Sequence, residues 1–313
     1  MSPLALTTLE QCLLETLDSP PAETRRVLHG RGRRWPGLEQ LTVDWLEGVV
    51  LVSLFREPEA DGLAALRALL TRVGESRTWK NSSARHLLLH LRYLPNSPTE
   101  FLSGEPLEGW KISEDGLYYQ LDLGRKQNNG LFLDMRYGRR WVRENAAGKR
   151  VLNLFAYTCG FSVAAIAGGA ERVVNLDMAS AALSRGRDNH RLNGHDLERV
   201  SFLGYELFKS WGRVRREGPY DLIIIDPPSF QKGSFAPTRD YAKILRKLPE
   251  LLAEAGSVLA CINAPDIDAD FLISGMAAEA PTLRFIQRLE NPPEFADIDP
   301  AGGLKALIFQ HSV

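Results

Sequence analysis

A carboxylate, two prolines and an aromatic residue end one apolar run of this chain. In DLIIIDPPSF (residues 221–230), four apolar residues lead to Asp226, Pro227, Pro228 and Phe230. Proline has no backbone N–H, so the loop is stiff, and its carbonyl oxygens remain able to accept a hydrogen bond from a substrate amino group. The ring of Phe230 offers a face on which a flat base can stack. The alternative is that the prolines only terminate a strand.

A second carboxylate, Asp177, follows the apolar run RVVNL. An acid at the end of the second strand of a parallel sheet accepts hydrogen bonds from the ribose hydroxyls of an adenosine, each contributing roughly 1.5–3 kcal/mol. The preceding segment VLNLFAYTCGFSVAA (151–165) predicts a strand, a turn and a helix, but it lacks the G-x-G-x-x-G pattern that a pyrophosphate requires. The alternative for Asp177 is a cap for a helix that begins at Ala179.

A nucleoside that is anchored by its ribose and lacks a pyrophosphate cradle indicates S-adenosylmethionine. Its amino-acid tail needs polar partners, and KQNNGLFLDMR (126–136) offers Asp134 and Arg136, which could instead form a surface ion pair. Methyl transfer is a direct displacement, so positioning supplies most of the catalysis. A guanine ring nitrogen needs no base, an exocyclic amine needs an acceptor such as Asp226, and carbon five of cytosine needs a cysteine nucleophile.

Short apolar runs separated by helix-length segments position these residues. The predicted strands are 151–155, 172–177, 200–203, 221–226, 257–263 and 302–310. This alternation is typical of a parallel sheet with helices on both faces, so we expect an α/β catalytic domain over 126–313.

The first part of the chain predicts a smaller α/β domain over 1–125. Leucine spacing indicates a helix over 4–17, which Pro20 and Pro21 end before another helix begins. Hairpins are predicted in 42–56, with a turn near Glu47-Gly48, and in 111–123, with a turn at Asp115-Gly116. A helix over 62–73 lies between them and is followed by irregular chain.

Composition excludes several classes of protein. The chain has 313 residues, with 38 Lys+Arg against 39 Asp+Glu, so it is not a polycation that holds nucleic acid by bulk charge. Five arginines within residues 25–34 predict a solvated surface, with RNA contact as the sharper alternative.

Three scattered cysteines predict neither a disulfide framework nor a zinc site. His86 and His90 are four residues apart on an expected helix, and we do not interpret them as metal ligands. We expect a cytoplasmic protein without a signal peptide, membrane span or metal.

The motifs DPPSF, FAYTCG and QNNGLFLDMR resemble those of the bacterial S-adenosylmethionine-dependent 23S ribosomal RNA methyltransferases, from about Val27 to the C-terminus. The chain is similar to the cytosine-carbon-five enzyme with an N-terminal PUA domain and to the guanine-nitrogen-seven half of a fused bifunctional enzyme. The resemblance implies a class I, Rossmann-like, mostly parallel sheet of seven strands. It also implies RNA as partner, held in part by the small domain.

The resemblance also implies roles for individual residues. Asp177 would bind the ribose, Met178 would pack on the adenine, and Asp226, Pro227, Pro228 and Phe230 would face the acceptor base. The methionine and ribose portions would be lined by Phe155, Tyr157, Thr158 and Gly160.

The chain departs from the family pattern in several places. Cys159 stands where glycine is usual, and Tyr205 stands where an acid usually contacts the adenine amine, with Glu206 next to it as a substitute. We expect no PUA domain before the small domain. Asn263 occupies the position of the cytosine enzyme's nucleophile, and Cys261 is about 6.6 Å deeper at ~3.3 Å per residue. Together with Ser229 in place of lysine, this favours a guanine nitrogen as acceptor.

Other functions remain open at this point. The fold could serve as a ribosome-assembly or RNA-binding factor with weak catalysis, or methylate DNA or protein. A nicotinamide dehydrogenase is disfavoured because the glycine fingerprint is missing. Asn189, at the end of the helix after Asp177, is interpreted as structural.

Overall fold

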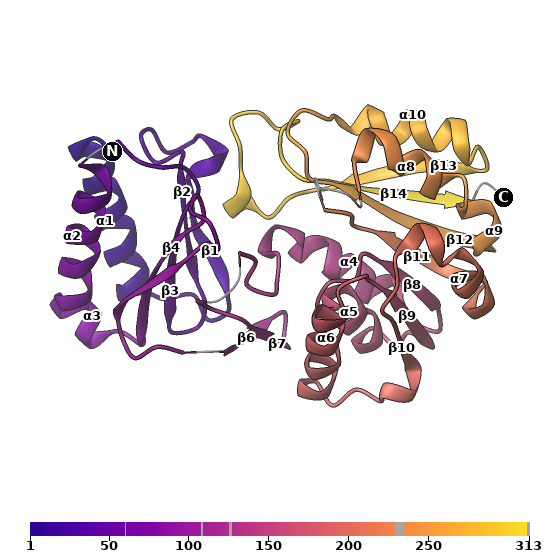
Figure 1. Cartoon of the computed structure of the whole chain (residues 1–313), viewed down its shortest axis with the longest axis horizontal. Helices are drawn as coiled ribbons and strands as arrows, with labels where there is room; N and C mark the ends of the chain where they lie inside the picture. The colour runs from indigo at the N-terminus through magenta and orange to yellow at the C-terminus, as the bar shows by residue number, and fades with distance from the viewer. Residues whose placement is uncertain (60, 108, 125–126, 229–234, 312–313) are drawn as a thin grey trace. The chain divides into compact units, whose positions relative to one another are not determined.

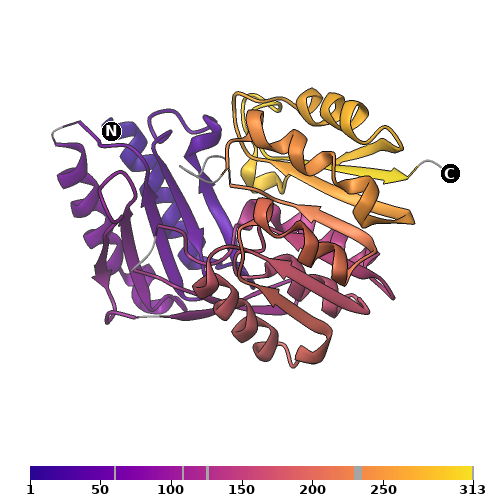
Figure 2. The ribbon, with the colours of Figure 1, turned by 45° about the vertical axis from the view of Figure 1, so that its right-hand side comes forward.

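Two compact units make up the chain. The computed structural model describes residues 1–59, 61–107, 109–124, 127–228 and 235–311. The first unit contains Met1–Leu133 and Pro292–Pro300, and the second contains Asp134–Asn291 and Ala301–Val313 (Figures 1 and 2). The division along the chain thus falls after Leu133, where the sequence led us to expect 125, and a short late segment joins the first unit.

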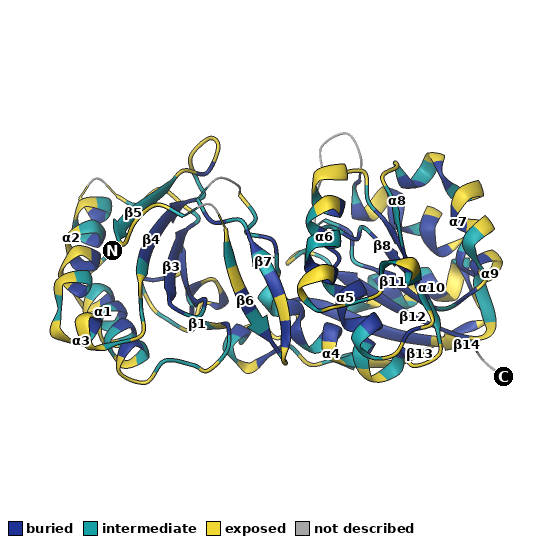
Figure 3. Ribbon diagram, turned by 90° about the horizontal axis from the view of Figure 1, so that it is seen from below, coloured by how far each residue is buried: buried dark blue, intermediate teal, exposed yellow. Residues whose placement is uncertain are grey.

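The first unit is built on a five-stranded sheet. Its strands, in the order in which they pair, are β1 (Arg25–His29), β2 (Leu41–Trp45), β3 (Val49–Leu54), β4 (His86–Leu91) and β5 (Thr99–Ser103). Neighbours are antiparallel except β3 and β4, which are parallel. The described helices of this unit are α1 (Pro3–Asp18), α2 (Gly62–Glu75) and α3 (Arg77–Asn81). Their buried faces pack on one side of the sheet, and their outer faces are exposed (Figure 3).

Several predicted elements of this unit are confirmed. The helix expected over 4–17 is α1, whose start is capped by Ser2: the Ser2 hydroxyl accepts a hydrogen bond from the Ala5 N–H at 3.2 Å. Both hairpins are present, as β2–β3 and as β6 (Trp110–Glu114) with β7 (Leu117–Leu121). Each turn has a non-glycine residue of positive φ, Glu47 or Asp115, followed by a glycine of positive φ, as tight hairpin turns require.

Other predictions for this unit are wrong. The chain after Pro21 forms β1 rather than a second helix, and the segment expected to be irregular contains β4 and β5. His86 and His90 therefore lie on a strand, not on a helix. The reason is that β4 has the sequence HLLLHL, in which leucine favours helix locally. Its pairing with β3, more than thirty residues earlier, overrides that preference.

The second unit contains the seven-stranded sheet. Its strands are β8 (Arg150–Leu154), β9 (Arg172–Leu176), β10 (Val200–Leu203), β11 (Tyr220–Ile225), β12 (Leu252–Ile262), β13 (Leu283–Leu289) and β14 (Lys305–His311). Its described helices are α4 (Arg136–Asn145), α5 (Gly160–Ala167), α6 (Ser180–Leu192), α7 (Trp211–Glu217), α8 (Pro237–Leu245), α9 (Leu248–Leu251) and α10 (Ala269–Glu279). All six strands foreseen from the apolar runs are present, and β13 adds a seventh.

The strand order is β10-β9-β8-β11-β12-β14-β13. All neighbours are parallel except β14, which runs antiparallel to both β12 and β13. The chain builds outward from β8 to β10 and then returns to β11 on the other side of β8. The carboxyl ends of β8 and β11 therefore flank the point where strand order reverses, which is where ligands bind in open α/β sheets.

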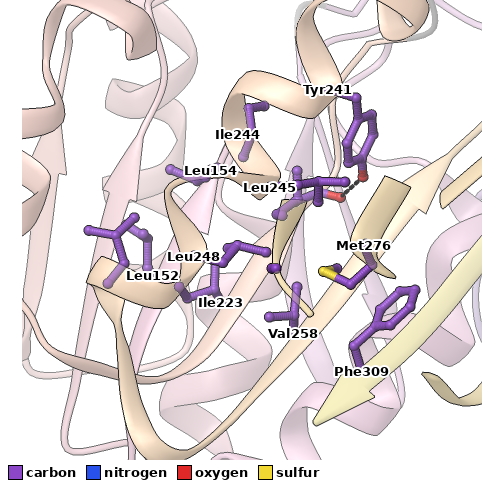
Figure 4. Packing of buried hydrophobic residues seen from close by; sticks show 14 of the residues in the cluster. Leu152, Leu154, Ile223, Tyr241, Ile244, Leu245, Leu248, Val258, Met276 and Phe309 are labelled. Carbon is purple, nitrogen blue, oxygen red and sulfur yellow. Dashed lines mark hydrogen bonds between the residues drawn. The ribbon is translucent and has the colours of Figure 1, made fainter. Parts of the chain in front are cut away.

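Two apolar clusters cover the two faces of this sheet. Alternate residues of β11 enter opposite clusters: Ile223 and Ile225 pack with α7, α8 and α10, whereas Leu222 and Ile224 pack with α4 and α5. Figure 4 shows the first of these clusters, in which Tyr241 of α8 also makes a hydrogen bond. Because both faces are buried, the central strands are continuous apolar runs and their ends are held firmly.

Within the described residues, no helix is long and apolar enough to cross a membrane.

A buried histidine makes the stability of the first unit dependent on pH. His90 is 1% exposed, so its imidazole ring is shielded from water. Burial, with a smaller effect of Arg92, lowers the pKa of His90 from 6.5 to about 4. Between these two values the unfolded chain binds more protons than the folded one, so stability falls as the pH falls.

We therefore expect the free energy of unfolding to decrease from pH 6.5 toward pH 4, with His90 contributing at most about 1.4 kcal/mol per pH unit. Urea unfolding at several pH values measures this slope, which His90→Gln should reduce. His311→Gln, at the partly exposed end of β14, is the control and should retain the slope. An equal slope in the wild type and in His90→Gln would contradict the assignment.

Candidate functional site

The loop that follows β8 has an unusual backbone. Phe155, Tyr157 and Cys159 have φ angles of 57°, 47° and 62°, although none of them is glycine. Such left-handed conformations cost roughly 1–3 kcal/mol each and persist only where the surroundings enforce them. The chain itself enforces this shape: Ala156 N–H donates to the Leu176 carbonyl oxygen and Cys159 N–H to the Ala156 carbonyl oxygen, at the carboxyl end of β8 where strand order reverses. The loop from Phe155 to Gly160, the first residue of α5, is therefore a candidate ligand cradle.

Asp177 holds this loop in place. One carboxylate oxygen accepts a hydrogen bond from the Tyr157 N–H at 2.8 Å, and the other accepts one from the Ala179 N–H, also at 2.8 Å. The second contact is the capping interaction considered as the alternative. A carboxylate has about four lone-pair positions, so both oxygens remain able to accept a further hydrogen bond. Capping the chain before α6 and binding a ribose are therefore compatible roles for one side chain.

Helix α6 supports the loop from beneath. The buried Asn189 side chain donates a hydrogen bond to the Thr158 carbonyl oxygen at 3.0 Å. Gly186 lies against Cys159, because a Cβ added at Gly186 would lie 2.3 Å from the Cys159 sulfur. Cys159 is fully buried, and burial raises the pKa of its thiol, so the group is protonated at neutral pH. The cysteine that stands in the usual glycine position thus packs into the space that Gly186 leaves.

A chain of buried polar side chains lies below the cradle. Asn153 of β8 donates to Asn175 of β9 at 2.9 Å, and Asn175 donates to the Ser162 hydroxyl, also at 2.9 Å. Ser162 in turn shares a hydrogen bond with His190 at 2.9 Å. Sequence reasoning missed this network. Its signal was an asparagine at the same place in two buried strands, RVLNL and RVVNL, which pair in register.

Carboxylates gather at the ends of β11 and β12. Burial and the charge of Asp134 raise the pKa of Asp226 to about 7, against the opposing effect of Arg139. Asp134 accepts a hydrogen bond from the Asn263 side chain at 3.1 Å. Arg136 and Arg139, both on α4, are 8% and 4% exposed. The predicted residue Asp134 thus lies beside Asn263 and near Asp226, and the predicted Arg136 is buried at the start of α4. Arg139 and the Asn263 contact were not anticipated.

The proline loop lies partly outside the described residues. Pro227 is buried and Pro228 is half-buried, while Ser229 and Phe230 are not described. Behind this loop the Tyr241 hydroxyl donates to the Cys261 carbonyl oxygen at 2.9 Å and lies 3.4 Å from the Ile225 carbonyl oxygen. This side chain joins the ends of β11 and β12.

The opposite end of the rim presents apolar side chains. Met178 and Tyr205, which follow the neighbouring strands β9 and β10, are 49% and 40% exposed. The Glu206 carboxylate accepts a hydrogen bond from the Phe208 N–H at 2.9 Å and so caps the short helix η4 (Leu207–Lys209). The guanidinium of Arg213 lies 4.2 Å from the centre of the Tyr205 ring.

These features fit a sulfonium nucleoside better than a dinucleotide. The rim offers a ribose acceptor at Asp177, an exposed apolar side chain at Met178, and both carboxylate and guanidinium groups near β11. The loop after β8 contains bulky residues where a pyrophosphate would need glycine.

Residues 25–310 match the sequence profile of the family described as S-adenosylmethionine-dependent methyltransferase. The chain belongs to this family. Its cofactor is therefore S-adenosylmethionine, as the rim indicates.

Curated relatives carry more specific names. The chain is 36% identical over 166 residues to ribosomal RNA large subunit methyltransferase I of Aeromonas salmonicida, covering 51% of this chain and 42% of that protein. It is 32% identical over 202 residues to ribosomal RNA large subunit methyltransferase K of Neisseria meningitidis, covering 62% and 55%. The chain spans about half the length of these relatives. They confirm the resemblance drawn from the sequence motifs.

Solved structures confirm the fold. The crystal structure of SMU.776 complexed with SAH (S-adenosylhomocysteine) superimposes with a TM-score of 0.85 at 26% identity, covering 99% of this chain and 83% of that chain. The class I methyltransferase fold with a seven-stranded, mostly parallel sheet is thus confirmed.

The contact between Cys159 and Gly186 yields a test of the packing beneath the cradle. Alanine normally stabilises a helix interior relative to glycine by about 1 kcal/mol. At Gly186 we expect the reverse, a loss of about 1–3 kcal/mol, because the added methyl group meets the Cys159 side chain. In a Cys159→Gly background, Gly186→Ala should be neutral or stabilising. Urea unfolding of the four proteins measures the coupling; additive effects would show that the two residues do not constrain each other.

Proposed function

We propose that this chain transfers a methyl group from S-adenosylmethionine to a base of large-subunit ribosomal RNA, at a guanine nitrogen rather than at carbon five of cytosine. The observation that carries the proposal is the pairing of two features at the switch point: a cradle held by Asp177 at β8 and β9, and Asp226-Pro227-Pro228 at the end of the adjacent β11. The names of the curated relatives support RNA as the substrate.

The residues of the rim would act mainly by positioning. Bound S-adenosylmethionine supplies an electrophilic methyl group on a sulfonium. Asp177 would accept hydrogen bonds from the ribose, Met178 would cover one face of the adenine with Glu206 near its edge, and Asp134 and Arg136 would hold the amino-acid tail. The loop Phe155–Gly160, with Tyr157 and Thr158, would enclose the intervening part. These residues would align the nitrogen lone pair of the base with the methyl group and its sulfur leaving group, and alignment would supply most of the rate.

The acceptor side favours a nitrogen atom because the cysteines are unsuitable as nucleophiles. Cys261 is fully buried among residues that pack with α4 and α5, and burial raises the pKa of its thiol well above the usual value. Cys159 is buried in the same way, and Cys12 lies on α1 in the first unit. Carbon-five chemistry needs a thiolate in contact with the base. The residue exposed at the end of β12 is instead Asn263.

Asp226 suits a nitrogen acceptor. Because its pKa is raised to about 7, this carboxyl group exists in both protonation states near neutral pH. As a carboxylate it accepts a hydrogen bond from an N–H of the base or takes a proton that the methylated nitrogen releases. A guanine ring nitrogen with an exposed lone pair releases no proton, and Asp226 would then act in orientation alone.

The cofactor role of Asp177 is tested by calorimetry. We expect Asp177→Ala to weaken S-adenosylmethionine binding about tenfold or more, because the ribose loses its charged acceptor and the loop loses its anchor. Asp188→Ala, which removes a half-exposed acid on the same helix α6, is the matched control and should leave the affinity unchanged. Equal affinities in the two variants would contradict the ribose role. Absence of binding by the wild type would favour a binding factor without catalysis.

The acceptor atom is tested with Cys261→Ala. We expect methyl transfer to large-subunit RNA to persist within about twofold of the wild-type rate, since a buried, protonated thiol takes no part in a direct displacement. Cys12→Ala, on α1 of the first unit, serves as the cysteine control. Complete loss of turnover in Cys261→Ala alone, with cofactor binding retained, would restore the cytosine mechanism.

The substrate is tested by mass spectrometry of ribosomal RNA from cells with and without the gene. A methylated guanine that disappears on deletion and returns on complementation would establish both the nucleotide and the acceptor atom. An unchanged modification pattern would contradict the proposal.

A further inference from the structure

A basic and aromatic surface lies beside the rim of the second unit. It begins directly after β10 and extends over η4 and α7, and α8 borders it. We name it the α7 platform, made up of Tyr205, Phe208, Lys209, Trp211, Arg213 and Arg216. Three of its members are aromatic and three are cationic, and all lie within twelve residues of the chain.

The cations of the α7 platform are exposed and lie within eight residues of one another in the sequence. Lys209, Arg213 and Arg216 are exposed, and among the described residues none of them forms an ion pair with a carboxylate. Arg215, on the same short helix, does pair with Glu250 at 3.5 Å. Arg213 and Arg216 are three residues apart and therefore share one face of α7, which Arg215 does not.

The arginine run of the first unit provides a contrast. Arg26 forms an ion pair with Asp44 at 2.5 Å, Arg33 with Asp297 at 2.8 Å, and Arg25 with Glu294 at 3.7 Å. Local carboxylates therefore neutralise three of the five arginines in residues 25–34. The α7 platform instead gathers three exposed cations that form no ion pair with a carboxylate among the described residues.

The aromatic members are held in place with part of each ring accessible. Tyr205 is 40% exposed, and Arg213 braces its ring at 4.2 Å. Phe208 and Trp211 are half-buried against the apolar cluster, with ring centroids 6.4 Å apart. Lys243 of α8 lies 5.5 Å from the centre of the Phe208 ring, so α8, which follows the proline loop, adjoins this surface. The surface is thus connected to both the β10 end and the β11 end of the site.

We propose that the α7 platform binds a single-stranded segment of the substrate RNA, an inference that rests on the proposed function. Bases stack on aromatic side chains whatever their sequence, and unpaired arginine and lysine side chains bind the phosphates between them. Tyr205 with Arg213 provides the stacking position nearest the rim. Lys209, Arg213 and Arg216 provide the phosphate contacts. The acceptor base, continuous with this strand, is thereby brought to the end of β11.

The test measures RNA affinity as a function of salt. The probe is a fluorescein-labelled, mixed-sequence single-stranded RNA of about 20 nucleotides, longer than the site size of a typical single-strand binding surface. The variant combines Lys209→Gln, Arg213→Gln and Arg216→Gln. The control is Arg284→Gln, an exposed arginine on β13, at the opposite edge of the sheet. S-adenosylmethionine affinity is measured by calorimetry on every protein, which also reports whether each one folds.

We expect the triple variant to reduce the slope of log affinity against log salt by about 2, because each phosphate that is no longer neutralised removes about 0.7 from the slope. Tyr205→Ala should weaken RNA binding about fivefold or more without changing the salt slope, and Tyr205→Phe should restore it. The control should match the wild type, and cofactor affinity should be the same in the triple variant, the control and the wild type.

The alternative outcomes are distinguishable. If the wild type binds RNA and the triple variant binds it equally well, the α7 platform is overturned and the proposed function still stands. Loss of cofactor affinity in Tyr205→Ala with RNA binding intact would make Tyr205 a wall of the adenine pocket, which also overturns the inference. A wild-type chain that binds S-adenosylmethionine but no RNA would contradict both the α7 platform and the proposed RNA substrate.

Discussion

The carboxylate of Asp177 is the interaction on which the rest of the site depends. It accepts hydrogen bonds from the backbone of Tyr157, in the loop after β8, and of Ala179, in the turn before α6. Neither contact is strong by itself, yet together they join the ends of two adjacent parallel strands. A loop with three non-glycine residues in the left-handed region would otherwise relax. The group that shapes the cradle is thus also the group proposed to bind the ribose.

Close packing beneath the cradle stabilises that strained loop. Gly186 lets α6 approach Cys159, and Asn189 binds the carbonyl of Thr158. Below them Asn153, Asn175, Ser162 and His190 form a buried series of hydrogen bonds. Each of these four side chains makes at least one hydrogen bond, although the Asn153 Oδ1 has no partner among the described residues, and a connected network admits few alternative arrangements. This gives the rim a defined shape before any ligand arrives.

Charge is distributed differently in the two units. In the first unit several exposed arginines are matched by nearby acids, which holds loops and the late segment Pro292–Pro300 in place. In the second unit burial, together with the nearby charge of Asp134, raises the pKa of Asp226 to about 7. The cations of the α7 platform have no acidic partners within the part of the chain that the structure describes. Like-charge proximity and unpaired charge both cost stability, and both are typical of sites that bind a ligand.

Much of the second unit was predictable because its information is local. Each central strand is an apolar run buried on both faces, and the functional carboxylates Asp177 and Asp226 stand directly after two of these runs. Parallel pairing brings the ends of such runs to one edge, so Asp177 and Asp226 could be assigned to one rim from their positions in the chain. The hairpins of the first unit were equally local, because their turns carry a left-handed residue and a glycine.

The amino-acid sequence alone therefore determined the sheet, its helices and the rim, since periodicity and turn residues act over a few positions. Tertiary structure decided the rest. It made a strand of the leucine-rich β4 through pairing with β3, and it placed Cys159, in the loop after β8, against Gly186 of α6. It also separated the arginines that are neutralised from those that are not. These outcomes depend on contacts between residues far apart in the chain, whose partners cannot be identified until the chain has folded.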